Sequence, residues 1–198
     1  MAETDLHRDL MVDLIETLKD WFAADPQTYV SGNILLFYEP GNKRRHVSPD
    51  VLVVRGVPKR QRDNYLAWEE GKAPDLVIEV TSKTTRTEDS RQKSELYRTI
   101  LRVPEYFLFD PRAEYLDPQF QGFRLRRGRY VAIKPIAGRL PCEVIGLHLE
   151  KDGNQLRLWD PIAGRRVPTP GEARALAEAE AARLRQELEK LKRKMQGK

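Results

Sequence analysis

The chain has 198 residues with a net charge of +5, and 40% of its residues are hydrophobic. This length suits one domain with an appendage, and the hydrophobic content suffices for one core. A single cysteine excludes an intrachain disulfide, and there is neither a secretion-signal pattern nor a run of about 18 apolar residues. We therefore expect a cytoplasmic protein without a membrane span. The positive charge permits a polyanionic partner without requiring one.

The N-terminal region predicts a helix followed by a strand. Leucines recur every four residues from Leu6 to Leu18, a spacing typical of an amphipathic helix over residues 4–22. His7 is expected on or beside the polar, solvated side of this helix. Residues 28–38 are rich in apolar and aromatic side chains and predict the first strand.

Two short apolar runs, residues 48–54 and 73–81, carry acidic residues in segments that should be buried. Both runs contain β-branched residues and begin beside a proline, which predicts strands covered on both faces. A buried carboxylate is costly unless it is paired or binds a metal. Because sequential strands usually lie side by side, Asp50 and Glu79 are expected to converge and hold a hard divalent cation such as Mg²⁺.

The next part of the chain predicts a loop, a helix and a strand. The polar stretch 55–73 is expected as a loop or short helix over the site. Residues 87–101 predict a helix on which Lys93 and Tyr97 share one stripe. Strand and hairpin patterns follow: a strand over residues 105–110, and hairpins with turns at residues 127–129 and 152–154.

The C-terminal region predicts a linker over residues 161–170 and a helix over residues 171–198. Thr169 and Glu172 have the spacing of a capping box. Apolar residues then alternate spacings of four and three, which is typical of a parallel coiled coil and predicts a homodimer. A helix packed on its own domain and a frayed tail stay open as alternatives. The apolar positions are Ala177, Ala181, Leu184, Leu188, Leu191 and Met195.

Several of these segments resemble a known family. Pro49-Asp50, followed by Glu79 on a second apolar strand, resembles the PD-(D/E)XK nuclease superfamily. A longer set of segments is similar to the Uma-type restriction-endonuclease branch of that superfamily: residues 74–82, Lys93, Tyr97 and residues 103–111. The resemblance spans residues 5–168 and implies an α/β (α+β) fold with a restriction-endonuclease-like αβββαβ core and a mixed central sheet. The order of helices and strands predicted from periodicity agrees with this core.

The resemblance also implies a metal site. Asp50 and Glu79, with a backbone carbonyl near Val80, would hold Mg²⁺, for which Mn²⁺ is a substitute. Both acids lie in the predicted buried strands, as a metal site of this kind requires.

Nucleases of this superfamily use a lysine to assist phosphodiester hydrolysis. An E-x-K motif would place that lysine at position 81, where this chain has Thr81. Lys93 is the favoured replacement, because some related nucleases carry a Gln-x-x-x-Tyr pattern on the corresponding helix and Lys93 precedes Tyr97 by four residues. Lys83 is the alternative.

The sequence thus predicts a nuclease domain over residues 1–160, with extra C-terminal hairpins, followed by the linker and the helix. The expected function is a Mg²⁺-dependent endonuclease whose partner and substrate is nucleic acid, with DNA favoured. The competing interpretation is a catalytically silent module that uses the nuclease fold to bind nucleic acid or to assemble with partners through its tail. The missing lysine of E-x-K favours this alternative, whereas the two buried acids favour the enzyme.

Overall fold

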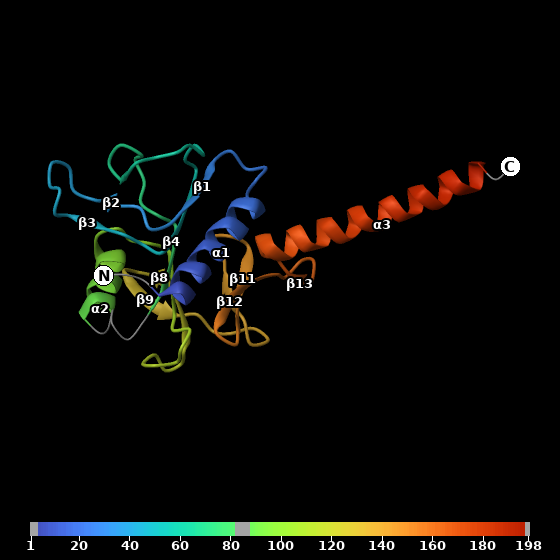
Figure 1. Ribbon diagram of the computed structural model, residues 1–198. Helices are drawn as coiled ribbons and strands as arrows, with labels where there is room; N and C mark the ends of the chain where they lie inside the picture. The colour runs from blue at the N-terminus through green and yellow to red at the C-terminus, as the bar shows by residue number, and fades with distance from the viewer. Residues whose placement is uncertain (1–3, 82–87, 197–198) are drawn as a thin grey trace. The chain divides into compact units, whose positions relative to one another are not determined.

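The computed structural model describes residues 4–81 and 88–196 and begins with helix α1 (Asp5–Trp21) (Figure 1). The hydroxyl of Thr4 caps this helix by accepting a hydrogen bond from the backbone N–H of His7 at 3.2 Å. Its leucine stripe is buried from Leu10 to Leu18, as the four-residue spacing predicts, and Leu6 is partly buried.

A six-stranded mixed sheet forms the centre of the first unit, in the order β1-β4-β6-β7-β8-β9. β6 and β7 are parallel because helix α2 (Glu88–Thr99) connects them, and the other neighbours are antiparallel. The order α1, β1, β4, β6, α2, β7 confirms the predicted αβββαβ core. The strands are β1 (Thr28–Ser31), β4 (Val51–Arg55), β6 (Leu76–Val80), β7 (Glu105–Phe109), β8 (Phe120–Arg126) and β9 (Arg129–Ala132).

The prediction of one continuous strand over residues 28–38 is wrong, because the chain breaks at Gly32 and Asn33. A Cβ at Gly32 would lie 1.9 Å from the carbonyl oxygen of Asp50, and Asn33 has a φ of 49°. A glycine is therefore needed where the chain passes over the backbone of Asp50. The segment beyond the break enters a separate three-stranded sheet, whose strands are β2 (Leu36–Phe37), β3 (His46–Val47) and β5 (Tyr65–Leu66). The stretch 55–73, expected as a loop or short helix, thus contributes a strand.

A four-stranded sheet follows in the order β10-β11-β12-β13. Its central hairpin turns at Gly153, as predicted, with a φ of 61°. β13 lies inside the segment predicted as a linker, so the first part of residues 161–170 is a hairpin of this sheet. The prediction of a linker failed there because two residues are too few to show the alternation of apolar and polar side chains that identifies a strand. The strands are β10 (Leu140–Cys142), β11 (Leu147–Asp152), β12 (Gln155–Asp160) and β13 (Arg165–Arg166).

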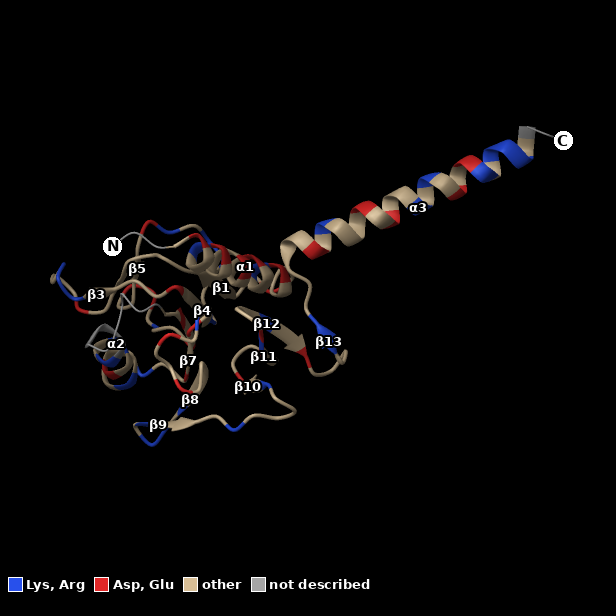
Figure 2. Ribbon diagram, turned by 60° about the horizontal axis from the view of Figure 1, so that its bottom comes forward, with Lys and Arg blue, Asp and Glu red and all other residues tan. Residues whose placement is uncertain are grey.

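The second unit, residues 168–198, contains helix α3 (Pro170–Gln196). The predicted capping box is confirmed: the N–H of Thr169 donates to the Glu172 carboxylate at 2.9 Å, and the N–H of Glu172 donates to the Thr169 hydroxyl at 3.3 Å. Acidic and basic residues alternate along this helix (Figure 2). None of the described helices is long and apolar enough to cross a membrane.

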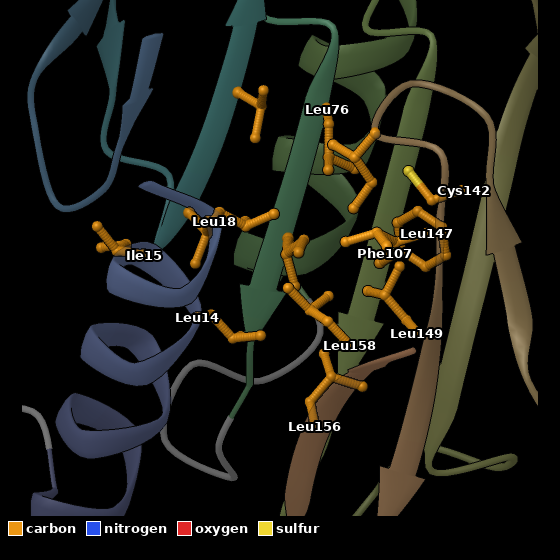
Figure 3. Close-up of a cluster of buried hydrophobic side chains, with 14 of the residues drawn as sticks. Leu14, Ile15, Leu18, Leu76, Phe107, Cys142, Leu147, Leu149, Leu156 and Leu158 are labelled. Atoms are coloured by element: carbon orange, nitrogen blue, oxygen red, sulfur yellow. The ribbon is translucent and has the colours of Figure 1, made fainter. Parts of the chain in front are cut away.

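Hydrophobic side chains cover both faces of the central sheet. On one face, leucines of α1 and of β11 and β12 close around Leu76 and Phe107 (Figure 3). On the other face, Tyr97 of α2 packs with Val77 and Tyr106. Burial of each such leucine stabilises the fold by about 1.5–3 kcal/mol relative to exposure. The two acidic strands therefore lie between two apolar layers.

Candidate active site

The two predicted acids lie opposite each other on neighbouring strands. β4 and β6 pair with Val51 opposite Ile78, and this register continued by one residue places Asp50 opposite Glu79. Both are buried, with 7% of Asp50 and 4% of Glu79 exposed. Oδ2 of Asp50 accepts a hydrogen bond from the N–H of Val80 at 2.8 Å. The predicted adjacency of the two acidic strands is therefore confirmed.

Helix α2 supplies two groups to the Glu79 carboxylate. The Tyr97 hydroxyl donates to Oε1 at 2.6 Å, and Nζ of Lys93 lies 2.9 Å from Oε2. The two side chains reach one carboxylate because residues four apart share a helix face. Lys93 retains 23% of its side-chain exposure, so its ammonium lies where the buried site meets the surface. The alternative, Lys83, lies outside the described residues.

Burial and charge act together on Glu79. Burial, and then the nearby charge of Asp50, raise the pKa of Glu79 to about 7, although Lys93 and Tyr97 act in the opposite direction. Two buried carboxylates that repel each other are stabilised by a cation between them.

The available donors fit a hard divalent cation. The N–H of Val80 faces Asp50, and in an extended strand the carbonyl of the same residue points to the same side. Among the described residues, no three histidine, cysteine or acidic side chains gather closely enough to hold a metal by themselves. Mg²⁺ usually keeps several waters and takes one or two carboxylates, so two acids and a backbone carbonyl suit it.

His7 is a site residue that the sequence analysis missed. Its Nε2 lies 3.3 Å from Oδ2 of Asp50, and only 8% of the residue is exposed. The expectation that His7 faces solvent is wrong, because His7 lies four residues before Met11 and seven before Leu14, on the buried stripe of α1. This spacing was the available signal. His7 therefore lies at the edge of the acidic pair, beside the carboxylate of Asp50.

Residues 1–141 match the sequence model of the Uma2 family, described as "Putative restriction endonuclease". The chain belongs to the Uma2 family. This membership confirms the resemblance found in the sequence and supports a nuclease function.

A curated relative and a solved structure are similar to this Uma2 chain. The uncharacterized protein sll1609 of Synechocystis sp. is 28% identical over 106 residues, which are 54% of this chain and 52% of the relative. The match thus spans about half the length of that relative. A crystal structure described as a putative nuclease belonging to DUF820 from Anabaena variabilis has a TM-score of 0.53 at 15% identity, covering 76% of this chain and 80% of that one. This likeness supports the fold.

Thr81 occupies the position of the E-x-K lysine in this Uma2 chain. Its hydroxyl donates to the carbonyl oxygen of Phe109 at 3.1 Å, and the residue is buried. The side chain is thereby tied to β7. The positive charge beside Glu79 comes from Lys93 of α2 instead.

Proposed function

We propose that this Uma2 protein is a Mg²⁺-dependent endonuclease that hydrolyses phosphodiester bonds of DNA, with Mn²⁺ as a substitute metal. One observation carries the proposal: Asp50 and Glu79 lie buried and opposite each other, and Lys93 contacts Glu79. A structural ion pair alone would not require the second buried acid beside Glu79.

Each residue has a distinct part in this proposal. Asp50, Glu79 and the Val80 carbonyl would hold Mg²⁺, which when bound supplies Lewis-acid stabilisation of the charge on the phosphate. Lys93 keeps a positive charge beside Glu79 and offsets the negative charge that develops during cleavage. Tyr97 fixes the second oxygen of Glu79 through its 2.6 Å hydrogen bond.

Cleavage assays on a plasmid and on single-stranded DNA test the proposal. The purified protein should nick or cut DNA with Mg²⁺ or Mn²⁺ and lose this activity in EDTA. Asp50→Asn and Glu79→Gln should reduce the rate at least about a hundredfold, as expected when a catalytic metal is lost. Glu16→Gln is the matched control, because Glu16 is a half-exposed acid paired with Lys19 on the surface of α1.

The same assays decide whether Lys93 or Lys83 takes part in cleavage. Lys93→Ala should lose activity because it removes the cation beside Glu79, and Lys83→Ala should retain it. A larger loss with Lys83→Ala would transfer the role to that residue.

A catalytically silent nuclease-fold module is the second candidate, favoured by Thr81 at the position of the E-x-K lysine. Cleavage at the wild-type rate by Asp50→Asn or Glu79→Gln would identify a contaminating nuclease and favour this candidate. The absence of metal-dependent cleavage by the wild-type protein would do the same.

A further inference from the structure

A groove of about 760 Å³ lies beside the candidate active site. One wall comes from the β2–β3 hairpin and the segment after it, and the other comes from α2. The lining residues are Leu35, Tyr38, Arg45, His46, Val47, Ser48, Arg91, Gln92, Lys93, Glu95 and Leu96. Because Lys93 contacts Glu79 and Ser48 precedes Asp50 by two residues, the groove borders the acidic pair.

Positive charge dominates this groove. Arg45, Arg91 and Lys93 line it, against a single acid, Glu95. Oε1 of Glu95 is neutralised by Arg98 at 2.6 Å. Arg45 and Arg91 are both exposed. Nε of Arg45 lies 3.3 Å from Oε2 of Glu39, but both side chains are at least half exposed, so a phosphate can displace this weak surface pair. Figure 2 shows the basic segments at the tip of the β2–β3 hairpin and on α2.

Apolar and aromatic surface accompanies the charge. Tyr38 and Leu96 are partly buried against the core below the groove, and Leu35 is 41% exposed. The ring of His46 packs against Phe37 with centroids 5.3 Å apart, which holds this side of the groove in place. A basic groove with flat side chains is the combination that binds single-stranded nucleic acid, since the cations follow the phosphates and the bases stack.

We propose that this groove binds a single strand of DNA and leads it to Asp50 and Glu79. Arg45 and Arg91 pair with its phosphates, and Tyr38 stacks on a base. The groove volume lies within the 300–1,000 Å³ usual for small ligands, so it suits a few nucleotides of one strand. This inference rests on the proposed function and deepens it by naming the form of the substrate.

Binding of a short fluorescein-labelled DNA strand, free or annealed to its complement, tests the inference in EDTA, where metal-dependent cleavage cannot occur. The test variant is the full chain carrying Arg45→Gln and Arg91→Gln. The control carries Arg127→Gln and Arg129→Gln, which remove two exposed charges at the β8–β9 turn, outside the groove. Thermal denaturation of all three proteins verifies that they fold alike.

The wild-type protein should bind the single strand more tightly than the duplex. The groove variant should weaken single-strand binding by about tenfold or more and lower the slope of log K against log salt by about 1.4, the value for two phosphate contacts on a single strand. The control should bind like the wild-type protein. Equal loss in the control, no loss in the groove variant, or tighter binding of the duplex would overturn the inference.

Cleavage is measured separately, so the two proposals can fail independently. Groove-dependent binding without metal-dependent cleavage would leave the inference standing and remove the endonuclease. Metal-dependent cleavage by the wild-type protein, together with normal DNA binding by the groove variant, would support the endonuclease and overturn the groove inference.

Discussion

Glu79 lies between groups that act on its charge in opposite directions. Burial and Asp50 favour the protonated carboxyl and raise its pKa from 4.5 to about 7, while Lys93 and the Tyr97 hydroxyl favour the ionised form. Between these two pH values the folded metal-free protein holds a proton that the unfolded chain has released. Its folding stability should therefore fall as the pH rises through this range.

Metal affinity should have the opposite pH dependence. A metal binds the ionised carboxylate, so binding must release the proton of Glu79 at pH values below about 7. We expect the affinity for Mn²⁺ to rise with pH, by up to about tenfold per pH unit, and to level off above neutrality. Isothermal titration calorimetry at fixed ionic strength measures this directly.

Tyr97→Phe provides the matched variant for this prediction. It keeps the buried ring but removes the hydrogen bond that favours ionised Glu79, so the pKa of Glu79 should rise. The pH at which Mn²⁺ affinity levels off should move upward in this variant. An affinity independent of pH in the wild-type protein would show that Glu79 is already ionised or is not a ligand.

Single residues of the site differ in how far the sequence reveals them. Asp50 and Glu79 were predictable because a carboxylate inside an apolar run is conspicuous. Lys93 was predictable in position through its spacing from Tyr97, but its contact with Glu79 depends on how α2 packs on the sheet. His7 was missed because a single polar residue on an otherwise apolar helix stripe was assigned to solvent.

At the scale of elements, one buried carboxylate connects the central sheet to the start of the four-stranded sheet. Glu105 of β7 is 1% exposed, and its oxygens accept hydrogen bonds from Nε of Arg124 at 2.8 Å and from the N–H groups of Glu143 and Val144 at 3.1 and 2.9 Å. Arg124 lies on β8, and the two backbone donors follow β10. The charge is thus compensated by groups from two segments, β8 and the residues that follow β10.

Glu105→Gln should destabilise the fold by about 1.5–3 kcal/mol, because it removes the buried charge that pairs with Arg124, whose other acidic partner, Glu143, is exposed. Urea denaturation measures the loss. Glu143→Gln is the control and should cost less than about 1 kcal/mol, since this carboxylate is 63% exposed. Equal effects of the two variants would mean that Glu105 does not connect the sheets.

The elements that the sequence did not predict are short. β3, β5 and β13 each have two residues, too few for an alternating pattern. The break at Gly32 depends on the approach of Asp50, which lies eighteen positions further along the chain. In contrast, β4 and β6 are continuous apolar runs, and α1 has a regular stripe, so local sequence determines them.

At the scale of the whole molecule, the family match does not cover the entire first unit. The match ends at residue 141, whereas Leu147, Leu149 and Leu158 of β11 and β12 belong to the same hydrophobic cluster as Leu14 of α1. The hairpins beyond the match therefore complete the core. The sequence predicted these hairpins from their turn residues but not that they cover the sheet, because that depends on tertiary packing.

Helix α3 has an exposed apolar seam that a second copy of the chain would cover. Leu184, Leu188 and Leu191 are 51%, 52% and 58% exposed. In the single chain, Glu180 pairs with Arg183 at 3.0 Å and Lys192 with Glu189 at 3.3 Å along the helix surface. In a parallel pair, Glu180 would face Arg185 and Glu187 would face Lys192 of the other chain, which are attractive contacts at the g and e positions.

We therefore propose a parallel homodimer through α3. Multi-angle light scattering of the full chain should give twice the 23.0 kDa of one copy. Leu188→Glu should shift the protein toward the monomer, because it places a charge in the seam. Leu176→Glu is the control: Leu176 is 63% exposed, like the seam leucines, but lies off the seam, so this change should leave the dimer intact. A wild-type mass of 23.0 kDa at all concentrations would remove the coiled coil, and a dimer that persists in Leu188→Glu would move the interface away from α3.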